Sequence, residues 1–135
     1  MKTLCPLLIA VLTYASSFAQ FTSDMNFTDI YGNTINPTSI LNEGKHIYLD
    51  FFSTSCGACN SVASEVANAY EYYGSNNENV FFLGVDYNSS SSACLNFANQ
   101  HNTDFPIISG QQGGLDIFNL FEQFGYPSGR RISLE

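Results

Sequence analysis

Two apolar runs in the middle of the chain have the composition of buried β-strands. Residues 46–52 (HIYLDFF) are rich in aromatic and β-branched side chains, and residues 80–86 (VFFLGVD) are almost continuously apolar. A run of this length and character is expected of a strand that is covered on both faces of a sheet. The shorter run 105–108 (FPII) predicts a further strand.

Segments with helical spacing separate these strands. The first, residues 56–73, places its apolar side chains on one stripe. A Ser-rich segment at 88–92 predicts the start of a second helix that continues through 93–99, and residues 115–124 predict a third. Because strands alternate with helices, the chain is predicted to be an α/β protein with parallel strands joined by right-handed crossovers.

The part of the chain before residue 45 is predicted to be an extension of this fold. Residues 27–30 and 34–36 predict two brief strands around a Tyr-Gly-Asn turn signal, and residues 37–41 predict one helical turn. We therefore expect an N-terminal strand extension at 20–44, followed by the main domain at 45–135.

Residues 1–19 have the pattern of a cleaved secretory signal peptide. Lys2 gives a positive start, residues 4–12 form an apolar run, and Ser17-Phe18-Ala19 supply a small-x-small site for cleavage before Gln20. A membrane anchor is the alternative interpretation, but a spanning helix needs about 20 apolar residues. We therefore expect export, with no membrane anchor after cleavage.

Composition and charge narrow the function classes. The chain has 135 residues, a hydrophobic share of 44% and a formal net charge of -8. The length fits one domain, and the apolar share can build a packed core. The acidic balance argues against nucleic-acid binding, which needs a basic surface to displace phosphate counterions, and against docking on an anionic membrane.

Three cysteines remain once the leader is removed: Cys56, Cys59 and Cys94. Two of them form a C-x-x-C motif at a strand-to-helix junction, where the unpaired N–H groups of the helix start favour a thiolate. Since one helical turn separates them, Cys56 can attack a disulfide and Cys59 can close a small ring. The motif is therefore interpreted as a redox pair, and Cys94 as a small buried hydrophobic residue.

Two alternatives remain for this pair, namely an inert structural disulfide and half of a zinc site. A zinc site would need two more ligands, for which Cys94 and His101 are candidates, but the chain has no second C-x-x-C motif. His46 and His101 are interpreted as surface or strand-end residues. No metal and no cofactor is therefore predicted.

Four segments, in chain order, carry a resemblance to a known family. They are 49–59 (LDFFSTSCGAC), the strand end 84–86 (GVD), the segment 102–108 (NTDFPII) and the loop 125–128 (GYPS). In this order they resemble the thioredoxin-like proteins and, among these, the exported TlpA-like disulfide reductases. The resemblance implies a thioredoxin-like fold, with a central mixed sheet flanked by helices, and disulfide exchange through the CGAC dithiol.

The resemblance also implies roles for individual residues. Cys56 would be the exposed nucleophile, Cys59 the resolving thiol, and Asp50 the buried carboxylate that transfers a proton to the resolving thiol. Pro127 would be a cis-proline facing the dithiol, and the Tyr126 backbone would pair with an extended substrate segment. Taken alone, a carboxylate within IYLDFF is either desolvated or at a strand end facing water, and we expect the buried state.

The chain departs from the family pattern near the dithiol. Ser55 stands where the family usually has Trp, so a flat substrate-contact surface is lost, and Ala58 stands where Pro is frequent. The peroxiredoxin pattern would need Pro at Leu49 and is not met.

A larger departure follows Pro127. Only residues 128–135 (SGRRISLE) remain, and Arg130-Arg131 is a poor start for a central strand. Either the domain is C-terminally incomplete or the fold closes differently, and we expect the first, with one strand edge unpaired. Phe51, Phe81 and Leu83 would then lose part of their cover, which predicts marginal stability.

These observations predict an exported thiol–disulfide oxidoreductase that acts in a periplasmic or extracellular location. Its partners would be thiols or disulfides of exported proteins, together with a redox partner that the sequence does not identify. The alternative is a binding module that keeps the fold but holds a locked, structural Cys56–Cys59 disulfide.

Overall fold

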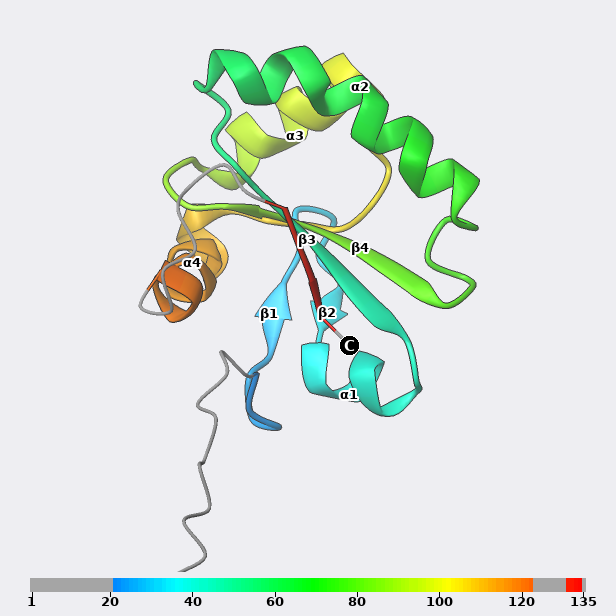
Figure 1. Ribbon diagram of the computed structural model, residues 1–135. Coiled ribbons are helices and arrows are strands. Elements are labelled where there is room, and N and C mark those ends of the chain that lie inside the picture. Colours follow the sequence, from blue (N-terminus) through cyan, green and yellow to red (C-terminus); the bar gives the residue numbers. More distant parts are fainter. Residues whose placement is uncertain (1–20, 123–130, 135) are drawn as a thin grey trace, which may run out of the picture.

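A four-stranded mixed sheet forms the centre of the protein (Figure 1). The computed structural model describes residues 21–122 and, for the backbone, 131–134. The strands are β3 (His46–Phe52), β4 (Val80–Asp86), β5 (Ile107–Ile108) and β6 (Arg131–Leu134), in the order β5-β4-β3-β6. The pairs β3/β4 and β4/β5 are parallel, whereas β6 is antiparallel to β3. The predicted α/β fold with a mixed sheet is confirmed.

The two long strands have the predicted bounds and are in full register. His46 pairs with Val80 at one end and Phe52 with Asp86 at the other, so both strands end at the same edge of the sheet. The loops that follow Phe52 and Asp86 are therefore neighbours. In open α/β sheets, binding sites lie at this edge, outside the carboxyl ends of the strands.

Two helices cover one face of the sheet. They are α2 (Gly57–Tyr72) and α3 (Ser91–His101), which lie together on the same side of the strands in Figure 1. Their buried side chains, among them Val66 and Phe97, pack with Phe52 and Phe82 of the sheet. Ser90 caps the start of α3 by accepting a hydrogen bond from the N–H of Ala93, as a Ser at this position is expected to do.

The opposite face is covered by α4 (Gly114–Glu122) and by the N-terminal segment. Ile47, Leu49 and Phe51 alternate along β3 with the residues of the other face, and they pack with Ile117 and Phe121 of α4. A 3-10 helix, η1 (Gly110–Gln112), precedes α4.

The N-terminal extension folds as a hairpin and a short helix. Its elements are β1 (Phe27–Thr28), β2 (Thr34–Ile35) and α1 (Pro37–Asn42). The buried carboxylate of Asp29 accepts hydrogen bonds from the N–H groups of Tyr31 and Asn33 at 2.9 and 2.8 Å, which fixes the turn. Phe21 and Ile35 are buried in the same cluster as Phe51.

Two expectations about the C-terminal part are wrong. The segment after Arg130 forms strand β6, which pairs with β3 from Ile47 to Asp50, so this edge of β3 is not unpaired. Among the described residues β6 is an edge strand, where charged residues are tolerated better than in a central one. Phe51 and Leu83 are also fully covered, since the N-terminal extension and α4 pack over them, and Phe81 is partly buried.

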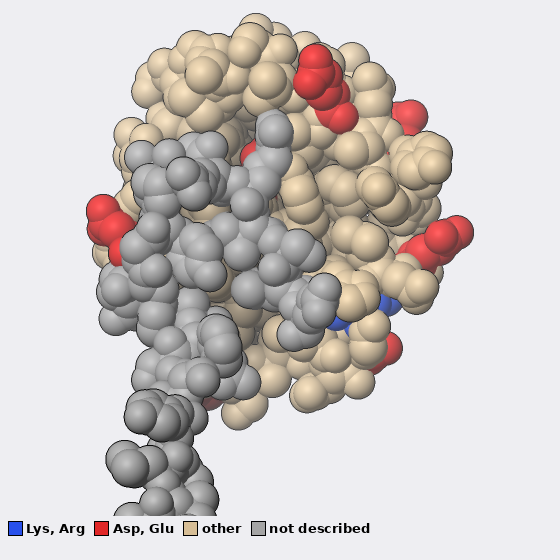
Figure 2. Space-filling model, in the orientation of Figure 1, with Lys and Arg blue, Asp and Glu red and all other residues tan. Residues whose placement is uncertain are grey.

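The surface of the described part is mostly uncharged. In the view of Figure 2 a few separate acidic side chains stand out among uncharged residues, and basic side chains show in one small area. Within the described residues, no helix combines the length and the apolar character needed to cross a membrane. The predicted leader at 1–19 and the loop with Tyr126 and Pro127 lie outside the described residues.

Candidate active site

The two cysteines of the C-x-x-C motif form a disulfide at the start of α2. Cys56 is the N-cap residue of the helix and Cys59 lies in its first turn, with 5.2 Å between the two Cα atoms. The N–H of Cys59 donates a hydrogen bond to Sγ of Cys56 at 3.2 Å. In the reduced protein this N–H and the positive end of the helix dipole would both favour a thiolate on Cys56.

The disulfide is accessible from the surface. Cys56 and Cys59 are each half-buried, and Gly57 and Ala58 between them are exposed. A side chain added at Gly57 would meet nothing within 4 Å, so the approach to the pair is open on this side. Cys59 packs against the core beneath α2 and α3. The arrangement therefore has an outer sulfur, Cys56, and an inner one, Cys59.

A buried carboxylate binds the dithiol loop, the segment 53–56 between β3 and the start of α2. Asp86, at the end of β4, is fully buried and accepts hydrogen bonds from the N–H of Thr54 at 3.3 Å and of Asn88 at 3.0 Å. The Ser89 hydroxyl donates to the same carboxylate at 2.8 Å. Asp86 was not predicted as a site residue, although an acidic residue that ends an apolar strand and precedes Asn and Ser is a recognisable signal of a capped loop.

Hydroxyl groups also connect the dithiol loop with the loop between β4 and α3. Oγ1 of Thr54 lies 2.8 Å from Oγ of Ser89, and the Ser53 hydroxyl donates to Oδ1 of Asn88 at 2.9 Å. Ser53 is itself buried and also bonds Oγ of Ser55, the residue before Cys56. The backbone before Cys56 is therefore fixed to the β4–α3 loop by several independent hydrogen bonds.

Asn60, the residue after Cys59, binds the dithiol loop from the helix side. Its Nδ2 donates to the carbonyl oxygens of Thr54 at 3.1 Å and of Cys56 at 2.9 Å. Its Oδ1 lies 2.9 Å from Nε2 of His101, the last residue of α3. The sequence motif gave no signal for Asn60, because its partners lie on a loop and on a different helix.

Asp50 lies in the middle of β3 on the α2/α3 side of the sheet. It shares this face with Tyr48 and Phe52, whose side chains pack in the cluster beneath these helices. Asp50 is half-buried rather than fully buried as expected. Its neighbour in β4 is Gly84, and the space where a Gly84 side chain would lie is filled by Ile107, Phe105 and Phe52.

Cys94 is the buried free thiol that the sequence predicts. It lies in α3 and is completely inaccessible, and burial together with the nearby Asp86 carboxylate raises its pKa to about 12. Within residues 21–122 no group of three or more His, Cys, Asp or Glu side chains is arranged to hold a metal ion. His46 is exposed at the start of β3, and His101 bonds Asn60 as described above.

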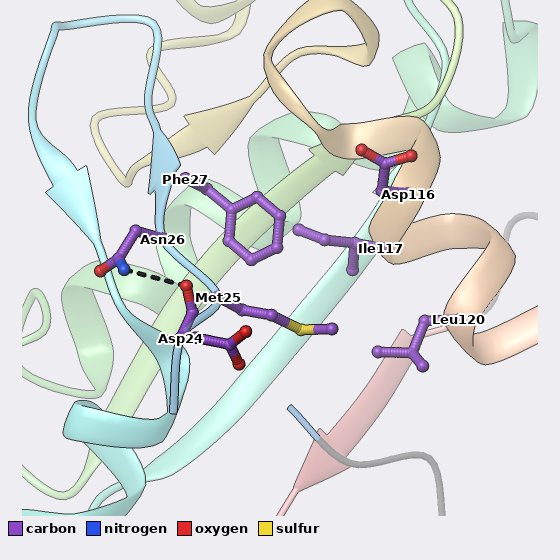
Figure 3. Close-up of a pocket in the computed structure, with 7 residues that line it drawn as sticks. All are labelled: Asp24, Met25, Asn26, Phe27, Asp116, Ile117 and Leu120. Atoms are coloured by element: carbon purple, nitrogen blue, oxygen red, sulfur yellow. Dashed lines mark hydrogen bonds between the residues drawn. The ribbon is translucent and has the colours of Figure 1, made fainter. Parts of the chain in front are cut away.

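A separate pocket of about 280 Å³ lies on the other face of the sheet (Figure 3). Met25 and Phe27 from the N-terminal segment and Ile117 and Leu120 from α4 form its apolar walls, with Asp24, Asn26 and Asp116 around them. None of its lining residues belongs to the dithiol site or to the loops that support it.

Comparison with known proteins agrees with this geometry. The Redoxin family model matches residues 16–117. The thiol-disulfide oxidoreductase ResA of Bacillus subtilis is 27% identical over 101 residues, which are 73% of this chain and 54% of that protein. The chain spans about half or less of the length of the curated relatives that it matches.

Solved structures with the same fold include two described as enzymes of disulfide chemistry. A putative protein disulfide isomerase from Bacteroides thetaiotaomicron has a TM-score of 0.71 and 19% identity, with 88% of this chain and 72% of that one covered. A secreted disulfide oxidoreductase from Mycobacterium tuberculosis has a TM-score of 0.61 and 21% identity, over 73% and 68% of the two chains. The predicted thioredoxin-like fold is therefore confirmed, and the chain belongs to the Redoxin family.

Proposed function

We propose that the protein is an exported thiol–disulfide oxidoreductase. The observation that carries this proposal is the disulfide itself, whose outer sulfur caps the exposed start of α2 and accepts the N–H of Cys59. A buried structural disulfide needs neither exposure nor a donor aimed at one sulfur. A nucleophilic thiolate needs both.

The reaction follows from the two positions of the sulfurs. The Cys56 thiolate attacks one sulfur of a substrate disulfide, forms a mixed disulfide with it, and expels the other substrate sulfur as a thiolate that takes up a proton. The Cys59 thiol then loses its proton and attacks Sγ of Cys56, and the second substrate thiolate leaves. The substrate gains two electrons and two protons, and the protein dithiol becomes the Cys56–Cys59 disulfide. The reverse sequence oxidises a substrate dithiol.

Asp50 is proposed as the acceptor of the Cys59 proton. Support comes from its place on the α2/α3 side of β3, the side against which Cys59 packs. Tyr126 and Pro127 are proposed, from the family resemblance, to bind an extended substrate segment opposite the dithiol.

Export and the partners also belong to the proposal. The leader pattern at 1–19 supports export, and one similar structure is that of a protein described as secreted. The proposed substrates are thiols or disulfides of other exported proteins, in a periplasmic or extracellular location. A separate redox partner must supply or accept the electron pair, because the dithiol holds only one pair.

Trapping of the mixed disulfide tests this function. In the Cys59→Ser variant the resolving step is blocked, so Cys56 should accumulate as a mixed disulfide with proteins of an extracytoplasmic extract, visible on non-reducing gels. Cys56→Ser should trap nothing, and Cys94→Ser should behave as the wild type. Absence of adducts with Cys59→Ser, with a Cys56–Cys59 bond that resists mild reductant in the wild type, would instead support the binding module with a structural disulfide.

A further inference from the structure

We propose that Asn60, held in place by His101, is the positioning residue of the nucleophile. The inference rests on the proposed function, since it assigns Asn60 the task of holding the backbone that carries Cys56. Neither residue belongs to the C-x-x-C motif, and they come from different helices, α2 and α3.

The orientation of the Asn60 amide is dictated by its neighbours. Both Nδ2–H groups point to carbonyl oxygens, those of Thr54 and Cys56. The reversed amide would place its oxygen against these two oxygens, which cannot donate. Oδ1 is therefore the atom that faces His101, and it can only accept.

This orientation fixes the proton on His101. Since Oδ1 of Asn60 accepts, Nε2 of His101 must carry the hydrogen that lies between them. The imidazole is held in turn by its contact with Phe97, whose ring centroid lies 4.6 Å away. His101 thus presents one fixed donor to the amide.

The two carbonyl bonds act on the nucleophile through the backbone. The carbonyl oxygen of Cys56 accepts two hydrogen bonds from Asn60, one from Nδ2 and one from the backbone N–H at 3.0 Å. Asn60 therefore holds the peptide group after Cys56 with both its side chain and its backbone. The bond to the Thr54 carbonyl holds the other side of Ser55. With this segment fixed, the N–H of Cys59 stays aimed at Sγ of Cys56, and the thiolate is favoured.

Four variants separate this role from a general structural one. Asn60→Ala removes both carbonyl bonds, and Asn68→Ala is the matched control because Asn68 is exposed on the same helix. His101→Ala removes the donor to Asn60. His101→Gln supplies an N–H donor in place of Nε2 but never carries a positive charge.

The measurement is the rate of Cys56 alkylation in the reduced protein as a function of pH. Because a hydrogen bond contributes about 0.5–1.5 kcal/mol, Asn60→Ala should slow alkylation at neutral pH by about two- to tenfold and move its pH midpoint upward. His101→Ala should shift the profile in the same direction, whereas His101→Gln and Asn68→Ala should match the wild type. A wild-type profile for Asn60→Ala, or a His101→Gln profile equal to that of His101→Ala, would overturn the proposal.

Two controls keep the test decisive. Cys94 is buried, so its failure to react shows that a variant is folded during the assay. If a variant unfolds, nitrogen NMR of the wild-type protein tests the proposal instead, because it shows which ring nitrogen of His101 carries the proton. The neutral ring should carry its proton on Nε2, and a proton on Nδ1 would contradict the proposal. Alkylation needs no turnover, so inactivity of the wild type towards disulfide substrates would refute the proposed function while leaving this result interpretable.

Discussion

Cys56, the N-cap residue of α2, has a different environment from the other two cysteines. It is half-buried and accepts an N–H at the start of a helix, whereas Cys94 is inaccessible and has a pKa raised to about 12. Cys59 is also half-buried and packs against the core. The surroundings of the three sulfurs thus fit the proposed roles of nucleophile for Cys56, resolving thiol for Cys59 and inert thiol for Cys94.

The raised pKa of Cys94 makes stability depend on pH in the alkaline range. Between the ordinary thiol pKa of 9.0 and the native value of about 12, the unfolded chain loses the thiol proton while the native protein keeps it. The free energy of unfolding should therefore fall with rising pH by about 1.4 kcal/mol per unit above pH 9. Below pH 9 this contribution should be constant.

Chemical denaturation of the wild type and of Cys94→Ala between pH 7 and about 11 isolates this effect. The variant should lack the decline due to Cys94, so the difference between the two free energies should shrink as the pH rises. A difference that stays constant over the range would contradict the account of Cys94.

Asp50 carries a second prediction at this scale. If its carboxylate accepts the Cys59 proton, Asp50→Asn should slow resolution of a Cys56 mixed disulfide by at least about tenfold, while Cys56 alkylation keeps its wild-type rate. Stopped-flow reaction of a preformed mixed disulfide measures this step. The control is Glu65→Gln, which replaces an exposed acidic side chain of α2 by its neutral amide. Equal resolution rates for the two variants would exclude Asp50 as the proton acceptor.

At the scale of elements, the contact between two loops decides where the dithiol lies. The loop after β3 and the loop after β4 leave the sheet at the same edge because the strands are in register from His46/Val80 to Phe52/Asp86. Asp86 then bonds the N–H of Thr54 in the first loop and of Asn88 in the second. The carboxylate is thus a shared acceptor for both loops.

Removal of this acceptor should destabilise the protein. Asp86→Ala leaves the part-buried donors of Thr54, Asn88 and Ser89 without the carboxylate that they share. We expect a loss of about 2–4 kcal/mol in the free energy of unfolding. Asp104→Ala, at an exposed position, should change stability by less than about 0.5 kcal/mol. Urea denaturation measures both, and equal effects would mean that Asp86 does not hold the loops.

The sequence predicts some elements of the fold better than others. Continuous apolar runs predict β3 and β4 with their observed bounds, because a strand covered on both faces has no other pattern. Strand β6 was missed because its first residue is Arg, which an edge strand tolerates. Local spacing predicts the dithiol, and the Asn and Ser that follow Asp86 are a local signal for its loop. Asn60 bonds His101 on a different helix, and for this contact the sequence has no local signal.

At the scale of the whole molecule, the N-terminal extension completes the core. Phe21 lies edge-on to Phe121 of α4, with 5.6 Å between the ring centroids, and belongs to the cluster that covers Phe51 and Leu83. Of the side chains that we expected to lose cover, Phe51 and Leu83 are therefore buried and Phe81 is partly buried, with cover from the N-terminal segment and α4. Their cover depends on residues that come before the first strand of the main sheet.

Truncation of one aromatic ring tests this closure. Phe21→Ala should lower the free energy of unfolding by about 3–5 kcal/mol, since the ring is buried and leaves a cavity. Tyr72→Ala, at a position that is 83% exposed, should have an effect of less than about 0.5 kcal/mol. Thermal or urea denaturation followed by circular dichroism measures both, and a melt of Phe21→Ala equal to that of the wild type would refute the closure.

The central claim, that Cys56–Cys59 is a working redox pair, is tested most directly by its reduction potential. Equilibration of the protein with glutathione buffers of defined ratio, followed by acid quenching and thiol alkylation, gives the fraction of the pair that is reduced. We predict a potential within about −120 to −270 mV, the range of catalytic dithiols. A potential below about −300 mV, the range of structural disulfides, would contradict the claim.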